Sequence, residues 1–194
     1  MSIAQETTAV PLTYEAYMAE GRVEGSYDII DGERVFTSEA TVWKHQRIVG
    51  NVFALLRDFE RASQQGHVLT APFDVTIRRF PLRTRQPDVL FITNERLESV
   101  GGVPAEGPLE IGPELVIEVL SPGETPRSVR GKLEDFRSVG VREAWLISPE
   151  AETVQVLRLD GEGTETVAVY IYGQTVESFA VPGLTVALAD IFAE

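Results

Sequence analysis

The chain has 194 residues, of which 43% are hydrophobic, and its 17 basic and 30 acidic residues leave a formal net charge of −13. This length suits one domain with a substantial core, so we expect a flexible N-terminal tail over residues 1–11 and a single domain over residues 12–194. No run approaches the roughly 20 apolar residues of a membrane-spanning helix, and the first residues lack the features of a secretory signal. The lack of cysteine excludes a disulfide framework and a thiolate metal site. We therefore expect a cytoplasmic protein with no membrane partner.

The acidic charge balance bears on nucleic-acid binding. Non-specific affinity for DNA comes from Lys and Arg side chains that displace counterions, so this composition argues against a protein that coats nucleic acid. The only lysines are Lys44 and Lys132, whereas arginines gather within residues 78–85 and at Arg127 and Arg130. These arginines could be solvated side chains of a hairpin and of a helix start, or a local patch that faces phosphate.

Three elements are predicted before residue 63. Thr13 caps a short helix that ends near Gly21. Apolar and polar residues alternate on both sides of Asp31-Gly32, which predicts two strands joined by a tight turn. From residue 41 to 62, apolar residues recur at helical spacing and predict a long amphipathic helix.

Extended chain is predicted next. Residues 68–69 and 73–77 form extended segments that are interrupted at Pro72. An arginine-rich turn then leads into a strand over residues 88–92, followed by a short helix near residues 94–97. The continuous apolar run from Leu115 to Leu120 is typical of a central strand that is buried on both faces.

The last third of the chain predicts a helix, a buried strand and several edge strands. A helix over residues 128–139 ends at Gly140, and residues 144–147 form a buried strand. The remaining predicted elements are antiparallel strands over 154–159, 166–172 and 176–179 and a short helix over 188–192. The order of elements favours an α/β fold, a mixed β-sheet flanked by α-helices with additional antiparallel C-terminal strands.

Asp88 and Glu118 stand out because each places a carboxylate in or beside an apolar strand. An ionised carboxylate inside a sheet costs several kcal/mol unless something cationic compensates it. If the two strands are neighbours and both side chains leave the same face, the carboxylates meet at one point. A hard divalent cation such as Mg²⁺ or Mn²⁺ would then neutralise them.

A metal held in this way binds phosphate oxygens and activates water, which is the chemistry of phosphodiester hydrolysis. Lys132 is the candidate for positioning the water or stabilising the developing charge. Glu33 could supply a third carboxylate as an auxiliary metal ligand, and His45 could orient water or contact phosphate.

Each of these residues also has an ordinary structural explanation. A Pro-Asp pair at a strand start is common turn chemistry, and Glu118 could be satisfied by a salt bridge to a helix arginine. His45 could be an exposed helix histidine, and Lys132 could be an ordinary helix-surface lysine. The combination of the four residues, and no single one of them, points to a site.

Several short runs also carry a resemblance to a known family. They are residues 27–33, 45–49, 86–89, 115–122, 132–133, 140–145 and 182–184. In this order, from about residue 12 to the C-terminus, they resemble the Uma-two family of restriction-endonuclease-like proteins, also called domain of unknown function 820. That family is assigned to the PD-(D/E)xK nuclease-like superfamily. The resemblance implies a mixed sheet with a helix on each side and a metal site at one edge of the sheet.

The resemblance also implies roles for individual residues. Asp88 and Glu118 match the acidic metal ligands, and Glu33 matches the acidic position contributed earlier in the chain. Lys132 matches a lysine that has moved from the usual E-x-K strand position, here Leu120, onto the following helix.

The chain departs from the family pattern at two further positions on that helix. Ser128 stands where the family usually has an aspartate, four residues before the lysine, and Phe136 stands where it often has a tyrosine. The change at Ser128 removes a fourth acidic contact that the family pattern would supply.

The function expected from the sequence is that of a Mg²⁺-dependent or Mn²⁺-dependent endonuclease, a hydrolase acting on nucleic acid, with DNA as the expected substrate. Its catalytic residues would be Asp88, Glu118, Lys132 and His45, and its metal ligands Asp88, Glu118 and Glu33. The alternative is a catalytically inactive nuclease-fold domain that acts as a protein-binding or oligomerising module. A homodimer or higher homo-oligomer, paired through the C-terminal edge strands, is compatible with either function.

Overall fold

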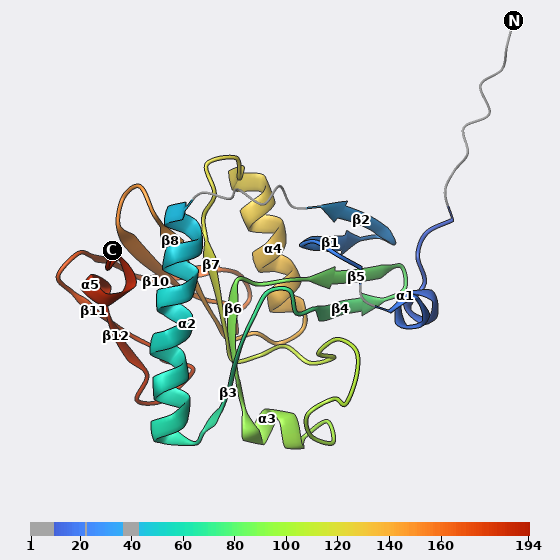
Figure 1. Ribbon diagram of the computed structural model, residues 1–194, viewed down its shortest axis with the longest axis horizontal. Helices are drawn as coiled ribbons and strands as arrows, with labels where there is room; N and C mark the ends of the chain where they lie inside the picture. The colour runs from blue at the N-terminus through green and yellow to red at the C-terminus, as the bar shows by residue number, and fades with distance from the viewer. Residues whose placement is uncertain (1–9, 22, 37–42) are drawn as a thin grey trace, which may run out of the picture.

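A six-stranded sheet forms the centre of the computed structural model, which describes residues 10–21, 23–36 and 43–194 (Figure 1). The strand order is β10-β9-β8-β7-β6-β3. The strands are β3 (Gly66–Thr70), β6 (Val89–Thr93), β7 (Leu115–Val119), β8 (Glu143–Ser148), β9 (Thr153–Arg158) and β10 (Glu165–Ile171). Strands β7 and β8 are parallel and the other neighbouring pairs are antiparallel, so the predicted mixed sheet is confirmed.

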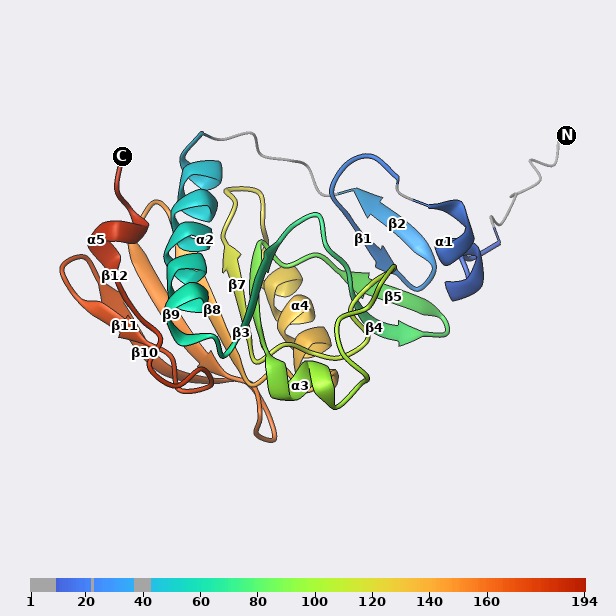
Figure 2. The ribbon, with the colours of Figure 1, turned by 60° about the horizontal axis from the view of Figure 1, so that its bottom comes forward.

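Two amphipathic helices cover opposite faces of this sheet (Figure 2). Helix α2 (Trp43–Ser63) packs on one face together with α5 (Leu188–Ile191) and the two-stranded sheet of β11 (Thr175–Glu177) and β12 (Thr185–Ala187). Helix α4 (Pro126–Ser138) packs on the other face. Successive residues of a strand point to opposite faces, so the central strands feed both cores and are mostly apolar.

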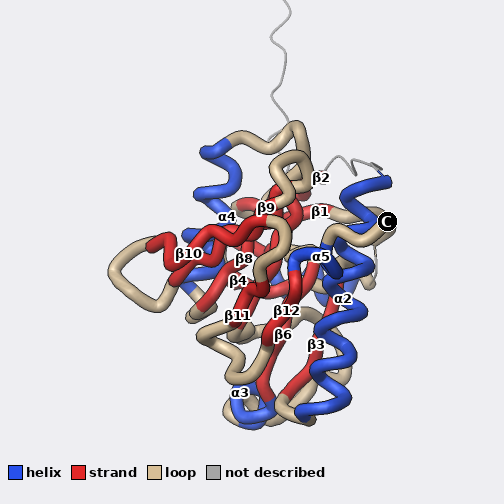
Figure 3. The backbone as a smooth tube through the Cα atoms, turned by 90° about the vertical axis from the view of Figure 1, so that its left-hand side faces the viewer, coloured by secondary structure: helices blue, strands red, loops and turns tan. Residues whose placement is uncertain are grey.

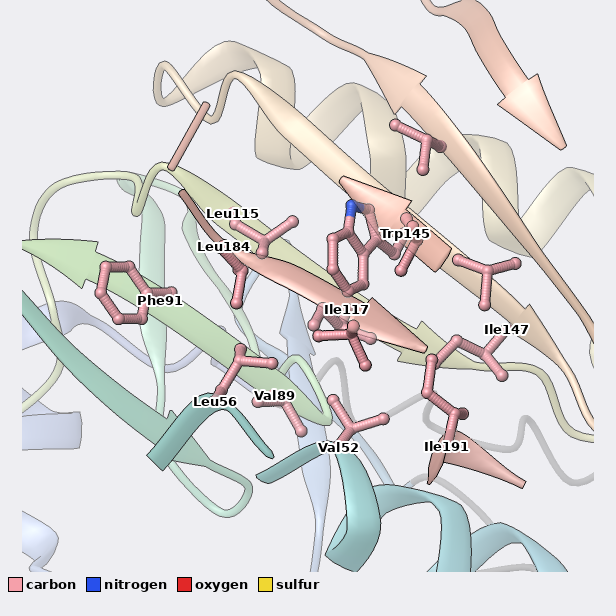
Figure 4. Packing of buried hydrophobic residues seen from close by; sticks show 14 of the residues in the cluster. Val52, Leu56, Val89, Phe91, Leu115, Ile117, Trp145, Ile147, Leu184 and Ile191 are labelled. Atoms are coloured by element: carbon pink, nitrogen blue, oxygen red, sulfur yellow. The ribbon is translucent and has the colours of Figure 1, made fainter. Parts of the chain in front are cut away.

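Figure 4 shows the core on the α2 side. Val52 and Leu56 of α2 lie close to Val89 of β6, and Ile117 of β7 fills the space beside them. These four side chains are fully buried. Burying an aliphatic side chain of this size stabilises a fold by about 1.5–3 kcal/mol, so α2 is held mainly by its apolar stripe.

A second, four-stranded sheet lies beside the first, in the order β2-β1-β5-β4. Its strands are β1 (Tyr27–Ile30), β2 (Glu33–Phe36), β4 (Val75–Arg79) and β5 (Leu82–Arg85), and α1 (Tyr14–Glu20) packs against it. Asp31 and Gly32 have φ angles of 54° and 85°, as a two-residue turn between twisted strands requires. The predicted hairpin is therefore confirmed, but it belongs to a separate sheet.

The segment expected to be an arginine-rich turn instead contains strand β5, and that expectation was wrong. Arg85 Nη1 lies 2.6 Å from Asp28 Oδ2, and its Nη2 lies 2.6 Å from Asp135 Oδ2 on α4. Arg83 Nε lies 2.8 Å from Oδ1 of the same aspartate. These arginines dock the small sheet on α4 through partly buried ion pairs, a role that is neither of the two considered from the sequence.

Most other predicted elements are confirmed within a few residues. Thr13 caps α1 through its side chain, and α3 (Asn94–Glu98) follows β6 directly. Strand β12 was not predicted, because three residues are too few to show an alternating pattern. Most of the predicted tail, residues 1–9, lies outside the described residues. None of the helices in the described ranges combines the length and apolar character needed to cross a bilayer.

A buried carboxylate fixes the C-terminal region to the central sheet. Glu143 of β8 is fully buried and accepts hydrogen bonds from Trp145 Nε1, from Ser178 Oγ at 2.9 Å and from Ala180 N at 2.7 Å. Burial raises the pKa of Glu143 even though these donors favour its ionised form. The carboxylate thus joins β8 to the loop between β11 and β12.

Replacing Glu143 by Ala leaves three buried donors without this acceptor. Each donor that stays unpaired lowers the stability of the fold by about 1–3 kcal/mol. We expect a loss of about 3 kcal/mol in the free energy of unfolding and a fall of roughly 6–12 °C in Tm, measured by calorimetry. Glu177→Ala, on the exposed face of β11, is the matched control and should change stability by less than about 0.5 kcal/mol. Equal effects of the two substitutions would contradict this role.

Candidate functional site

Asp88 and Glu118 meet where β6 and β7 run side by side. The antiparallel register pairs Val89 with Ile117, and continuing it by one residue sets Asp88 opposite Glu118. Asp88 Oδ2 accepts a hydrogen bond from Val119 N at 2.7 Å, which orients the carboxylate. Both acidic side chains line the same cavity, of about 240 Å³, on the α4 side of the sheet. The neighbouring strands expected from the sequence are therefore present.

Glu118 is the fourth of the five residues of the buried strand β7, and only 5% of its surface is exposed. Its Oε2 lies 2.7 Å from Lys132 Nζ, and its buried Oε1 has no hydrogen-bond partner among the described residues. Burial raises the pKa of Glu118 to about 7, and nearby Asp88 adds to the increase, whereas Lys132 opposes it.

Lys132 comes from the second turn of α4. This helix starts with the side chain of Thr125 as its cap and Pro126 in its first turn, and it packs on β7 and β8 through Leu133 and Phe136. Burial lowers the pKa of Lys132, but the two carboxylates beside it outweigh this effect and raise the pKa above its ordinary value. The ammonium is therefore charged and points back toward the strand.

The second of those carboxylates is Glu124, which the sequence did not single out. Its Oε1 lies 2.8 Å from Lys132 Nζ, and its Oε2 accepts a hydrogen bond from Ser121 N at 3.3 Å. Ser128, which stands where the family has an aspartate, lines the same cavity. Glu124 also lines it and provides an acidic contact from four residues earlier in the chain. A glutamate in a strand-to-helix loop looks like a solvated residue in sequence, and only the fold brings it to Lys132.

His45 reaches the cavity from the first turn of α2. Its Nε2 donates to Val119 O at 2.9 Å and lies 3.6 Å from Asp88 Oδ2. The nearby carboxylate of Asp88 raises the pKa of His45 above its ordinary value, against the effect of burial. The imidazole thus contacts both the strand that carries Glu118 and the carboxylate opposite it.

Glu33 lies elsewhere. It begins β2 directly after the Asp31-Gly32 turn, its side chain is exposed, and it is not among the residues that line this cavity. The structure brings together four of the five predicted site residues, Asp88, Glu118, Lys132 and His45, and does not bring Glu33 to them.

The donors at this cavity determine whether it suits a divalent cation. In the described ranges, no group of three or more His, Cys, Asp or Glu side chains is arranged to hold a metal. Mg²⁺, however, is usually bound through one or two carboxylates while it keeps several waters. The unpartnered Oε1 of Glu118 and the carboxylate of Asp88 on the same cavity fit a hydrated Mg²⁺ or Mn²⁺.

Replacing Lys132 by Met removes the cation and leaves Glu118 buried beside Asp88. We expect a loss of roughly 3–5 kcal/mol in the free energy of unfolding at about pH 8, and a smaller loss at about pH 5. The loss is larger at high pH because the pKa of Glu118 is raised in the folded state, to about 7 before the substitution. A carboxyl with a raised pKa favours folding while it is protonated. That contribution is lost as the pH rises through the folded pKa.

The measurement is urea unfolding in EDTA at the two pH values, with the fluorescence of the buried Trp145 as probe. Arg137→Met, at an exposed position in the last turn of α4, is the matched control. A loss that does not change between the two pH values would show that Glu118 is not the group that Lys132 neutralises.

Comparisons with known proteins bear on the family and the fold of the chain. The family model described as "Uma2: Putative restriction endonuclease" matches residues 14–189. Among solved structures, the chain is similar to the crystal structure of a "putative nuclease belonging to DUF820" from Anabaena variabilis. The TM-score is 0.74 and the sequence identity 21%, and the match covers 94% of this chain and 98% of that chain.

At that identity the structural likeness shows the fold alone. No curated protein matches the chain. The family model spans most of the sequence and the fold agrees with it, so the chain belongs to the Uma2 family of restriction-endonuclease-like proteins.

Proposed function

We propose that this protein is a Mg²⁺-dependent or Mn²⁺-dependent endonuclease that hydrolyses phosphodiester bonds in nucleic acid, with DNA as its substrate. The observation that carries the proposal is the meeting of Asp88, Glu118 and Lys132 at one cavity, with the lysine 2.7 Å from the buried carboxylate. Membership of the Uma2 family supports the reaction class.

Each residue has a distinct task in this proposal. Asp88 and Glu118 hold the cation, which when bound polarises a phosphate oxygen and lowers the pKa of water. Lys132 stays charged between Glu118 and Glu124, and its ammonium stabilises the negative charge that develops on the phosphate. His45 is a positioning residue, because it fixes Asp88 and Val119 O relative to each other.

Two helix ends favour an anion at the same place. The first described turn of α2 and the first turn of α4 lie at the same end of the six-stranded sheet (Figure 1), and they reach the cavity through His45 and Ser128. The N-terminal end of a helix carries a partial positive charge and N–H groups that lack partners within the helix. A phosphate can therefore approach this end of the sheet although the whole chain is acidic.

The net charge of −13 implies that binding depends on this local field and on the cation more than on a basic surface. Arg83 and Arg85 are used inside the fold, in ion pairs with Asp28 and Asp135. Arg127 and Arg130 on the first turns of α4 are exposed and so stay accessible to a phosphate.

The proposal predicts that metal binding and cleavage depend on the same two carboxylates. We expect Asp88→Asn and Glu118→Gln each to abolish Mn²⁺ binding in calorimetry, and to abolish cleavage of single-stranded DNA, duplex DNA and RNA probes in Mg²⁺ or Mn²⁺. Glu134→Gln, an exposed residue of the same helix as Lys132, is the matched control and should leave both unchanged.

His45→Asn is expected to weaken Mn²⁺ binding by about tenfold, as is common for residues that orient metal ligands. His67, which is exposed on β3, provides the control as His67→Asn. If the unmodified protein neither binds Mn²⁺ nor cuts any of the probes, the nuclease proposal is wrong and the non-catalytic protein-binding or oligomerising domain becomes the better interpretation.

One observation favours self-association, which is compatible with either function. Strand β10 is the edge of the six-stranded sheet, and Figure 3 shows it on the outside, away from α2. Its Val167, Val169 and Ile171 are 46%, 55% and 56% exposed. An edge strand with exposed apolar side chains is a ready template for pairing with a second chain. We propose a homodimer, or a higher homo-oligomer, built on β10.

Light scattering tests this assembly. The unmodified protein is expected to scatter as a dimer or larger species, and Val169→Lys to shift it toward the monomer because a charge on the edge opposes strand pairing. Val35→Lys, at a similarly exposed position on β2, is the control. A monomer at all concentrations would rule out the assembly and leave the nuclease proposal unaffected.

A further inference from the structure

A second cavity, of about 380 Å³, lies between α1 and the four-stranded sheet. Its lining includes the aromatic residues Tyr17, Tyr27 and Phe73, together with Asp74 and Gln86. The volume is near the lower end of the roughly 300–1,000 Å³ that is usual for small-molecule sites. A cavity of this size suits one small planar group better than an extended chain.

The polar groups of this cavity are fixed in position. Asp74 accepts hydrogen bonds from Tyr17 Oη at 2.7 Å, from Thr84 Oγ1 at 3.0 Å and from Gln86 Nε2 at 3.4 Å. The side-chain oxygen of Gln86 in turn accepts from Tyr27 N at 3.3 Å. Flat apolar rings around a held carboxylate and amide match a planar heterocycle that carries N–H donors.

This cavity adjoins the metal-site cavity. Gln86 lines both of them. At two other places, one of two adjacent residues lines each cavity. Ala71 and Ser26 line the metal-site cavity, and their neighbours Pro72 and Tyr27 line the second cavity. A group bound in the second cavity is therefore separated from the metal-site cavity by only a thin partition of chain.

We propose that the second cavity receives one unstacked nucleobase of the nucleic-acid substrate while the neighbouring phosphodiester lies at Asp88 and Glu118. The inference rests on the proposed nuclease function, and it adds that the substrate is single-stranded or locally opened at the cleaved position. A base inside a duplex has both faces stacked and cannot enter such a pocket.

Charge separates the roles of the two cavities. Asp74 and the exposed Glu106 make the second cavity acidic, which disfavours phosphate. A nucleobase is neutral, and its exocyclic amino group can donate to an acidic oxygen, as cytosine and adenine do. Stacking on an aromatic side chain is tolerant of sequence because every base has a flat face.

The test measures binding and not cleavage. Fluorescence anisotropy in Mn²⁺ compares a short single-stranded oligonucleotide with one of the same length in which every base is replaced by an abasic residue, both with backbone linkages that resist hydrolysis. We expect the oligonucleotide with bases to bind about tenfold more tightly, the usual size of one base–aromatic stacking contact. Tyr17→Ala should remove this preference without changing the affinity of the abasic oligonucleotide.

Two variants serve as controls, and a third tests the cavity independently. Tyr17→Phe keeps the ring and should keep the preference, and Tyr172→Ala, at a residue 63% exposed beyond β10, should not affect it. Asp74→Asn changes one polar group and keeps the shape of the cavity, so it is informative even if Tyr17→Ala loosens α1. We expect it to change which of four homo-oligonucleotides binds best.

The outcomes separate this inference from the nuclease proposal. A base preference that depends on Tyr17 in a protein that cuts nothing would support the cavity and overturn the nuclease. Cleavage that depends on Asp88, without a base preference or with one that Tyr17→Ala does not change, would overturn the cavity and leave the nuclease. Failure of both oligonucleotides to bind would also overturn the inference.

Discussion

The compensation of one buried carboxylate organises this protein. Glu118 lies near the end of a buried central strand, and an uncompensated charge there would cost several kcal/mol. Lys132 provides the compensation from α4, which connects β7 to its parallel neighbour β8 and so returns across the face that carries Glu118. The same pairing that makes the strand tolerable leaves one carboxylate oxygen unpartnered at a cavity.

The short segment between β5 and β6 is one of the connections between the two sheets. Strand β5 ends in the small sheet at Arg85, and β6 begins in the large sheet at Val89, so Gln86 and Asp88 lie at the junction of the two sheets. Arg85 ties this junction to α4 through Asp135. The connection explains why a residue of the second cavity and a residue of the metal-site cavity are only two positions apart, and why the small sheet belongs to the site's architecture.

Local patterns were sufficient for most elements and for part of the site. The period of the apolar residues predicted α2, the Asp31-Gly32 pair predicted a hairpin, and the continuous run around Glu118 predicted a buried central strand. Strand β5 was missed because its alternating arginines look solvated until Asp28 and Asp135 are placed beside them. Glu124 was missed for the same reason, since its partner Lys132 lies eight residues away on a helix.

The sequence by itself determined that two carboxylates sit in strands that disfavour them and that one of the chain's two lysines follows on a helix. It also carried the resemblance to the Uma2 family. Only the tertiary structure decided which of these groups meet: it brought Lys132, Glu124 and His45 to Asp88 and Glu118, and it placed Glu33 at the exposed start of β2. The physical reason is that charge compensation depends on distances between groups on neighbouring elements. Sheet register and helix packing set these distances, and the spacing of residues along the chain does not encode them.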